Sequence, residues 1–447
     1  MHSITSYTSN AHTNVVVMYV IAMFITSDDA SLRILSMTLY NIVTFIMIGL
    51  TFTSVILSGK LSFRLLPELK WLYLTLIWIV ISLVASKVMD SKTMLDEVYN
   101  YQWATGVNSP ELRGISFTVR FILSLFVIQF IISSINTREK YVTVMKYFLW
   151  MVCIFALFPL LQIILISIFN IEIGNIYYER SAIRIGGYVG EPSVLAGMLC
   201  CGLFSIVATI LFKNNIISFN KHFLMVFLGI IIIDLYMTSS TSIITAIMLS
   251  VIIFARKYLS KKSIILAIIL IITLLSSSIF QSSVLFKVGR QLSTVNIRSL
   301  SWVVGFNTIL DNPISGIGIG QAPFYVAPYL PHQSDIPFEV DRYFKFSESR
   351  YTPMNTYLEF LAETGFVGLL LLFLFIRSVY MHHRNRDKTN DQHFIQFAFG
   401  VGLFTIAIAI NSFPGGFYLG YLNFMIGMYI AGLKIYSTSF EKTVLMS

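Results

Sequence analysis

The sequence predicts an all-α integral membrane protein with about twelve transmembrane helices and one large loop on the outer side. Of its 447 residues, 56% are hydrophobic and only 12% are charged, and the mean hydropathy is +0.76. Because soluble domains carry about 25% charged residues, this chain cannot cover its surface with groups that bind water. Lipid is therefore the expected solvent for most of that surface.

Apolar runs long enough to cross a membrane recur along the chain. A spanning helix needs about 20 mostly apolar residues. Only Ser239 and Ser240 separate the seventh run from the eighth, which predicts a tight helical hairpin. The expected spans are residues 14–27, 34–57, 68–87, 115–134, 147–169, 192–212, 222–238, 241–256, 263–280, 356–378, 393–411 and 417–434.

The positions of Lys and Arg predict the orientation of these spans, since short loops rich in these residues stay in the cytoplasm. One set of alternating loops, with the C-terminal tail, holds eighteen of the 31 basic residues and only five acids. We therefore expect both termini in the cytoplasm and the longer, nearly charge-balanced loops outside. The basic residues are Lys60, Arg64, Lys70, Arg138, Lys140, Lys146, Lys213, Lys221, Arg256, Lys257, Lys261, Lys262, Arg377, Arg384, Arg386, Lys388, Lys434 and Lys442, and the acids are Glu68, Glu139, Asp387, Asp391 and Glu441.

The chain divides into three parts. Residues 1–280 hold nine spans with outer loops at 88–114 and 170–191, residues 281–355 form the large outer loop, and residues 356–447 hold three spans and a cytoplasmic tail. At about 75 residues the large loop is short for an independent domain, so we expect it to pack on the membrane portion. Within it, 297–311 is typical of an amphipathic interfacial helix, followed by a glycine-rich turn.

Composition and motifs exclude several other classes. The net charge of +9 is spread over short loops, whereas nucleic-acid binding needs a contiguous basic face. Cys153, Cys200 and Cys201 all lie in apolar runs and have neither disulfide-framework nor metal-ligand spacing. The N-terminus lacks the basic segment of a cleavable signal peptide. We expect no metal, no cofactor and no nucleic-acid partner.

The first candidate site is RIGGYVGEPSVLAG, residues 184–197. Its glycines allow close approach of the backbone to a ligand or a sharp turn, and Pro192 suits the first turn of a helix. Glu191 at the mouth of that helix is either a cap favoured by the helix dipole or an active-site carboxylate. The neighbouring Arg180 and Arg184 favour a functional role.

The second candidate site lies in the large loop. Arg290 and Arg298 could hold a lipid pyrophosphate, because a guanidinium binds phosphate oxygens as a bidentate fork. They precede SWVVGFNTILDNPISGIGIGQ, in which Asp311-Asn312-Pro313 is a turn signal. The three glycines after this turn favour tight packing against a neighbouring helix over ligand contact; they are Gly316, Gly318 and Gly320.

The third candidate site opens the tenth span. Asn355, Glu359 and Glu363 are spaced i, i+4, i+8 and line one helical face that enters the bilayer. Carboxylates there are costly unless they face water or basic partners, so they serve either a site or a structural ion pair. Arg120 and Asp234, also within spans, could be buried partners or line a cavity, and Asp234 could be a simple contact between helices.

Together, these motifs resemble the O-antigen polymerase (Wzy-type) and O-antigen ligase superfamily. The elements of the resemblance are the arginine–glycine–Glu-Pro segment, the arginine–tryptophan helix leading to DNPISGIGIG, and NTYLEFLAETGFVGLL. It covers residues 180–375 in detail and the whole chain in span number and in the large outer loop. It implies a GT-C-like, inverting, metal-independent glycosyltransferase of lipopolysaccharide biosynthesis in the bacterial inner membrane. Its implied substrates are undecaprenyl-pyrophosphate-linked oligosaccharides at the periplasmic face.

The resemblance also implies roles for single residues. Arg184 and Arg298 would bind the pyrophosphate with support from Arg290, Arg180 and Arg120, and would neutralise the leaving group. The acceptor hydroxyl needs a general base. The candidate bases, in order, are Glu191, Glu359 and His332, and the residues expected to line the substrate are Tyr188, Asn355 and Tyr357.

Three alternatives to a polymerase remain open. Ligases of the superfamily commonly carry a His before the Asn-x-Tyr-Leu segment, where this chain has Met354, which favours a polymerase of lipid-linked repeat units, with a chain-length regulator as a possible partner. A flippase or transporter would place charges near the bilayer midplane in two related halves. A cell-wall glycan polymerase of the shape, elongation and division type would differ in its motifs.

Overall fold

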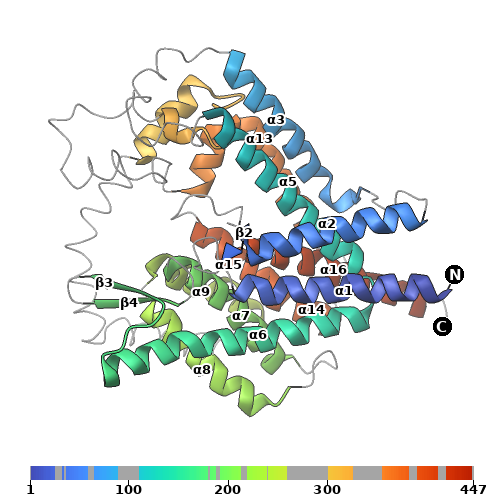
Figure 1. Ribbon diagram of the computed structural model, residues 1–447, viewed down its shortest axis with the longest axis vertical. Coiled ribbons are helices and arrows are strands. Elements are labelled where there is room, and N and C mark those ends of the chain that lie inside the picture. The colour runs from blue at the N-terminus through green and yellow to red at the C-terminus, as the bar shows by residue number, and fades with distance from the viewer. Residues whose placement is uncertain are drawn as a thin grey trace.

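The computed structural model is mainly helical (Figure 1). Within the part of the chain that it describes, strands occur only as two short antiparallel pairs. The structure describes residues 2–25, 33–34, 37–58, 65–88, 110–179, 182–187, 192–212, 219–238, 240–258, 301–325, 355–381, 390–410 and 419–444.

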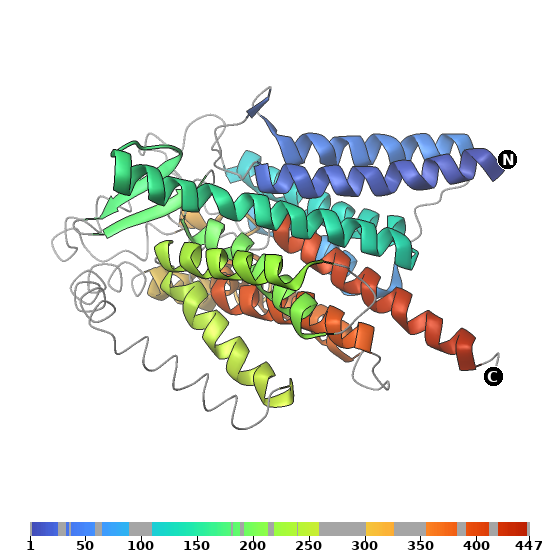
Figure 2. The same ribbon diagram turned by 90° about the horizontal axis from the view of Figure 1, so that it is seen from below.

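The first two helices lie side by side (Figure 2). They are α1 (His2–Ile25) and α2 (Leu39–Ser58). The predicted span 34–57 begins too early, because Arg33–Ile34 (β1) pairs with Met37–Thr38 (β2) before the helix starts. The apolar run alone could not show where the backbone changes from strand to helix.

Three long elements follow. After a single 3₁₀ turn, η1 (Pro67–Leu69), come α3 (Lys70–Val88), α5 (Pro110–Ser134) and α6 (Arg138–Ile164), and α6 continues into a π-helical turn, η4 (Leu165–Phe169). Helix α6 begins nine residues before the predicted span 147–169, since Thr137 caps it by accepting a hydrogen bond from the Lys140 amide. The apolar pattern therefore marked only the membrane portion of a longer helix.

The middle of the chain holds a strand hairpin and three helices. The antiparallel strands β3 (Asn175–Glu179) and β4 (Ala182–Gly187) lie in the predicted outer loop 170–191, so the fold is not purely helical there. Then come α7 (Pro192–Leu211), α8 (Lys221–Met237) and α9 (Thr241–Tyr258). Helix α7 begins at Pro192 as predicted, and only three positions separate the end of α8 at Met237 from the start of α9 at Thr241.

The C-terminal third is again helical. Residues 301–311 form a helix, as predicted for that part of 297–311, and lead through a turn to η5 (Ala322–Tyr325). The remaining elements are α13 (Thr356–Met381), α14 (Asn390–Ile395), the π-helical η8 (Gln396–Val401), α15 (Gly402–Ala409) and α16 (Gly420–Val444).

These helices form two packing units, shown apart in Figure 1. The first unit has α3, α5 and α13 around a core that includes Ile79, Phe121 and Phe375. The second has α1, α6–α8 and α14–α16 around a larger core that includes Phe148 and Phe424. Helices α5 and α16 contact each other and contribute side chains to both cores, so they hold the two units together.

Within the described residues, six helices are long and apolar enough to cross a membrane. They coincide with six of the predicted spans and support an integral membrane protein. The predicted spans 14–27, 222–238, 241–256 and 417–434 are also largely helical where described, while 263–280 lies outside the described residues. The six are Pro67–Ser86, Leu112–Ser134, Arg138–Phe169, Pro192–Leu211, Thr356–Val379 and Asp391–Ala409.

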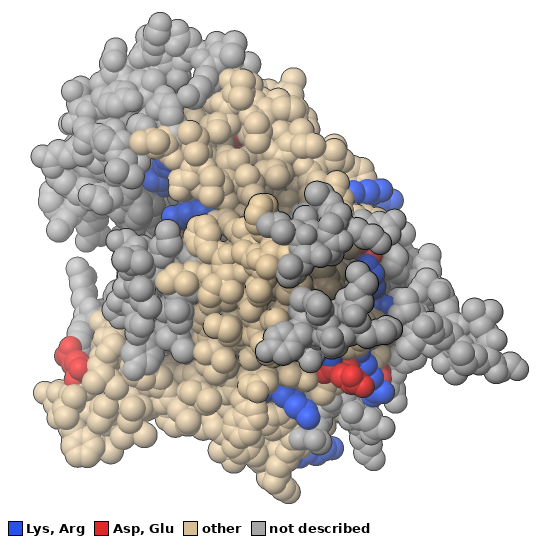
Figure 3. Space-filling view, turned by 45° about the vertical axis from the view of Figure 1, so that its right-hand side comes forward, with Lys and Arg blue, Asp and Glu red and all other residues tan. Residues whose placement is uncertain are grey.

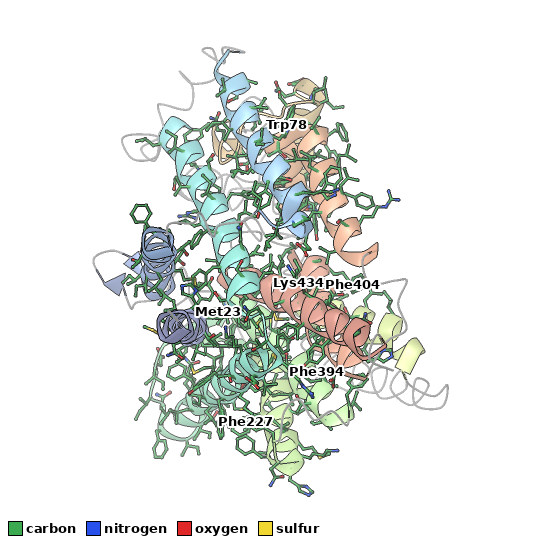
Figure 4. The ribbon with its side chains drawn as sticks, turned by 90° about the vertical axis from the view of Figure 1, so that its right-hand side faces the viewer. Met23, Trp78, Phe227, Phe394, Phe404 and Lys434 are labelled. Carbon is green, nitrogen blue, oxygen red and sulfur yellow. The ribbon has the colours of Figure 1, made fainter. Side chains whose placement is uncertain are left out.

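Residues assigned to one membrane side gather at one end of the fold. The start of α1 and the end of α16 lie at the same end of the fold, opposite the β3–β4 hairpin (Figure 1 and Figure 2). Near them, Arg138 lies 3.7 Å from Asp391, and Lys434 lies 3.5 Å from Glu68. Figure 4 shows Lys434 where the two units meet. Each of these two ion pairs thus joins residues that the Lys and Arg pattern assigns to the same side of the membrane.

Helix α13 is interrupted near its start by a backbone break. Gly365 has φ 67° and ψ −176°, a conformation that only glycine adopts readily. The amide of Phe366 therefore bonds the carbonyl of Pro313 (2.8 Å) rather than a carbonyl of its own helix. A segment distant in sequence, residues 312–320, thus fills the break; we call it the glycine turn.

The carbonyls released by this break all find donors. The glycine-turn amides of Ile317 and Gly318 bond the carbonyls of Ala362 (3.0 Å) and Glu363 (2.9 Å). From α3, the Ser82 hydroxyl also bonds the Glu363 carbonyl (2.9 Å), and the Trp78 indole bonds the carbonyl of Thr364 (2.7 Å; Figure 4). The break is therefore a closed network and not a frayed helix.

We expect Gly365→Ala to lower the free energy of unfolding. A side chain at this φ costs about 1–3 kcal/mol, and its Cβ would collide with the carbonyl oxygen of Ile314. Thermal unfolding in detergent measures the loss. The matched control is Gly229→Ala in α8, where a Cβ meets nothing within 4 Å and Ala favours the helix by about 0.5–1 kcal/mol. Equal midpoints for both variants would contradict the strained joint.

Candidate functional site

The β3–β4 hairpin carries Arg184 at the end of the fold away from the termini. Arg184 pairs in register with Tyr177, and the next residue, Ile185, is fully buried. Strand β4 packs against α6, α7 and α8, and the Gln162 side chain of α6 donates to the Ile173 carbonyl at the base of the hairpin. The hairpin is thus fixed to the second unit.

The Arg184 guanidinium reaches the C-terminal end of α8. Its Nε donates to the carbonyl of Thr238, the C-cap of that helix, at 3.2 Å. A cation is favourable there because the last carbonyls of a helix carry partial negative charge. This contact explains the orientation of a half-buried arginine, and it also gives Arg184 a structural role beside any role in binding.

Apolar side chains surround the base of the hairpin. Ile168, Phe169 and Ile171 are exposed, each by 50% or more. Asn170 between them adopts the left-handed conformation that ends the π-helical turn. Ile168 and Phe169 end the long apolar helix Arg138–Phe169 and Ile171 follows it, so the three form an exposed apolar collar just before the hairpin.

Six of the predicted site residues lie outside the described residues. They are Arg180, Tyr188, Glu191, Arg290, Arg298 and His332. Among the described ones, Arg184 lies on β4 in the second unit, whereas Arg120, Glu359 and Asn355 lie on α5 and α13 or at its start. The two described arginines of the predicted set, Arg184 and Arg120, therefore lie on different packing units.

Asn355 caps α13. Its Oδ1 accepts hydrogen bonds from the amides of Tyr357 (3.0 Å) and Leu358 (3.1 Å), the geometry of an N-cap. The Tyr357 hydroxyl donates to the carbonyl of Ala407 in α15 (2.7 Å). These contacts link α13 to the second unit and favour structural roles for two residues predicted to line the substrate.

Glu363 connects the glycine turn to α5. Its buried carboxylate accepts a hydrogen bond from the amide of Ala322 (3.3 Å) and interacts electrostatically with Arg113. Glu359, one turn earlier, is also buried and also acts on Arg113. The predicted alternative of a structural charge cluster therefore has support, with Arg113 as the basic member.

Arg113 and Arg120 flank one aromatic ring. The Cζ atom of each lies 5.3 Å from the centroid of Phe117 on the same helix. Arg120 is exposed and Arg113 is partly buried. Figure 3 shows that Lys and Arg on one face lie in small separate groups. The described residues of that face thus carry their basic side chains in local groups.

Asp234 is fully buried on α8. Neither of its carboxylate oxygens has a hydrogen-bond partner within the part of the chain that the structure describes. Its neighbours on the same helix, Ile231 and Leu235, belong to the core of the second unit. The predicted polar contact between Asp234 and a neighbouring helix therefore has no partner among the described residues.

Sequence inspection missed Arg113 and the polar face of α3. The spacing Arg113, Phe117, Arg120 is i, i+4, i+7 and could have indicated a shared helical face. Trp78 and Ser82 are likewise one turn apart within an apolar span. Within the described segments, no three His, Cys, Asp or Glu side chains gather in a way that could hold a metal ion.

We expect Asn355→Ala to lower the free energy of unfolding by about 1 kcal/mol, because it removes an N-cap. Asn355→Asp keeps the acceptor and should retain stability. Thermal unfolding of both variants in detergent measures the two effects. Equal losses for the Ala and Asp variants would show that the side-chain oxygen does not act as a cap.

We expect Asp234→Asn to raise stability. Burying a carboxylate without a hydrogen-bond partner is costly, and a neutral amide of the same shape should recover about 1–3 kcal/mol. Thermal unfolding of the detergent-purified protein tests this. Glu363→Gln is the control: its carboxylate has a backbone donor and a nearby arginine, so the same change should destabilise. A fall in the Asp234→Asn midpoint would show that an unseen donor holds the carboxylate.

Part of this chain is similar to a known protein family. Residues 223–373 match the family model described as O-antigen ligase. The matched segment runs from α8 through the glycine turn to about two thirds of the way along α13, and so includes Asp234, Glu359 and Glu363. No curated protein matches the chain. Over this segment the chain is similar to the O-antigen ligase family, which supports the resemblance to the O-antigen ligase and polymerase superfamily drawn from the motifs.

Proposed function

We propose that this protein is a membrane glycosyltransferase that polymerises undecaprenyl-pyrophosphate-linked repeat units at the periplasmic face of a bacterial inner membrane. The observation that carries the proposal is the family match at residues 223–373, joined to a helical membrane fold. The placement of Arg184 on a hairpin opposite the termini adds support.

The reaction requires one bond to form and one to break. The hydroxyl oxygen of the acceptor sugar attacks the anomeric carbon of the growing glycan, and the carbon–oxygen bond to the diphosphate breaks. The electron pair leaves on undecaprenyl pyrophosphate, and the hydroxyl proton passes to a general base. Attack from the side opposite the leaving group inverts the anomeric centre.

Arginine suits the leaving group in this site. Its charge persists whatever its environment and its donors match phosphate oxygens, so fixed guanidinium groups can stabilise the developing charge electrostatically. Arg184 is oriented by the end of α8 before any substrate arrives. We assign the leaving diphosphate to Arg184 together with Arg298, Arg290 and Arg180.

The general base is assigned by position. Glu191 directly precedes Pro192, the first residue of α7, seven residues after Arg184 in the chain. Glu359 is buried against the charge cluster with Arg113, which favours a supporting role for it. We therefore keep Glu191 as the proposed base, ahead of Glu359 and His332.

A ligase is the second candidate, and the description of the matched family favours it. Met354 stands where ligases of the superfamily commonly carry a His, which favours polymerase. The two differ in the phenotype of a deletion strain. Loss of a polymerase leaves lipid A–core bearing one repeat unit, and loss of a ligase leaves core alone.

We expect Arg184→Gln to shorten the products to a single repeat unit, with turnover reduced about 100-fold or more through lost transition-state stabilisation. A polysaccharide gel of the complemented deletion strain shows the length distribution. Arg184→Lys keeps the charge but not the planar fork and should retain part of the activity. Arg377→Gln, an exposed arginine late in α13, is the control. An unchanged distribution in both Arg184→Ala and Arg298→Ala would refute the assigned site.

A further inference from the structure

The arginine pair on α5 has hydrogen-bond donors without acceptors. Arg113 is partly buried, and its Nε has no hydrogen-bond partner. In the described part of the chain, Arg113 makes only the ring contact with Phe117 and electrostatic interactions. Burying an N–H donor without an acceptor is costly, and the described residues supply no acceptor for this one. Each guanidinium carries further N–H donors, and these can bind an anionic ligand.

The nearby carboxylates do not serve as that acceptor. Glu363 is engaged with backbone amides of the glycine turn and η5, including that of Ala322. Glu363 and Glu359 also interact with Arg113 electrostatically. The two carboxylates thus favour a guanidinium group at this position, and its N–H donors stay available to a ligand.

The spacing of the pair suits a diphosphate. Each Cζ lies 5.3 Å from the Phe117 centroid, so the two guanidinium carbons are at most twice that distance apart. Charge-assisted hydrogen bonds to phosphate oxygens take up only about 2.7–2.9 Å at each end. One guanidinium can therefore bind each phosphate group of a diphosphate that lies over the ring.

The position of Arg120 suits a ligand anchored in lipid. It lies within the apolar stretch Leu112–Ser134, and its side chain points back over Phe117 towards the start of the helix, as a snorkelling arginine does. Exposed Leu112, Ile115 and Val119 follow the same helix. An isoprenoid tail can lie along these side chains while its diphosphate meets the arginines.

The proposed reaction needs two such sites. The donor loses its diphosphate at the reacting carbon, whereas the acceptor reacts at the far end of its repeat unit and keeps its diphosphate. The two diphosphates must therefore lie apart by the length of a repeat unit. Arg184 belongs to the second packing unit, whereas Arg113 and Arg120 lie on the first half of α5, which packs against α3 in the first unit.

We propose that Arg113 and Arg120, stacked on Phe117, form a second lipid-diphosphate site that holds the acceptor substrate. The inference rests on the proposed polymerase function and makes it specific, because a ligase acceptor, lipid A–core, has no polyprenyl diphosphate. Arg184 then holds the donor, and each substrate has its own arginines.

Native mass spectrometry of the purified full-length protein with undecaprenyl pyrophosphate tests the site. We expect two lipids bound to the wild type and to the control Arg377→Gln, but one to Arg113→Gln/Arg120→Gln. Arg120→Gln alone changes an exposed side chain, so its fold should be intact, and it should lower occupancy of the second lipid about tenfold. Two lipids retained by the double variant would overturn the inference.

A second measurement separates binding from folding and identifies the source of the diphosphate. In lengthening assays, Arg120→Gln should raise the KM for the acceptor about tenfold while kcat stays nearly constant, since lost binding that is equal in ground and transition states acts on KM. Inorganic pyrophosphate at the same concentration should not displace the second lipid. Equal displacement, or an unchanged KM, would overturn a lipid-diphosphate acceptor site.

The outcomes distinguish the two proposals. A wild type that lengthens lipid-linked glycans while the double variant binds and reacts normally refutes only the second site. A wild type that binds one diphosphate lipid and transfers glycan to lipid A–core refutes the polymerase function, and the acceptor site with it.

Discussion

The structure depends most on how backbone polar groups are satisfied where α13 is interrupted. In a bilayer no water replaces a lost helix hydrogen bond, so irregular backbone persists only where protein supplies the partners. Here the glycine turn supplies amides and the carbonyl of Pro313, and α3 supplies Ser82 and Trp78. Gly316 and Gly365 both have positive φ. Because neither has a side chain, the two backbones can approach closely at these positions.

That joint also organises charge. It fixes Glu363 against the amide of Ala322 and faces α5, where Arg113 lies. A buried carboxylate is tolerated in a membrane when it has donors and a cation nearby. The same contacts that close the helix break therefore place a charge cluster beside an arginine pair. One element, the glycine turn, therefore both closes the break in α13 and positions the charge cluster.

The two packing units are held together by the crossing of α5 and α16. These helices bury apolar side chains on two sides, and at their crossing Gly427 lies against Ile131. Small residues at such crossings let helices approach closely in membranes. The crossing thus joins the unit that carries Arg184 to the helix that carries Arg113 and Arg120.

Much of the fold could be predicted from the sequence, because membrane helices follow from local apolar content. The six long apolar helices, the start of α7 at Pro192 and the helix at 301–311 all have local signals. The packing role of the glycines after Pro313 was also predicted, from their number and order.

The sequence could not predict features that depend on distant contacts. The break at Gly365 requires the carbonyls and amides of residues 312–320, which lie about fifty positions earlier. The β3–β4 hairpin lies in a loop without strong alternation, and the α6 start depends on the Thr137 cap. Arg113 was overlooked because its significance comes from Glu359 and Glu363 on another helix.

The apolar collar of Ile168, Phe169 and Ile171 has a consequence for the lipid environment. Exposed apolar side chains of this kind favour acyl chains over water and headgroups, so in a bilayer they would tie the height of the hairpin to the edge of the hydrocarbon layer. A change in hydrocarbon thickness costs fractions of a kcal/mol per Å of mismatch. Acyl-chain length therefore becomes a variable that sets how far Arg184 stands from the plane in which lipid phosphates lie.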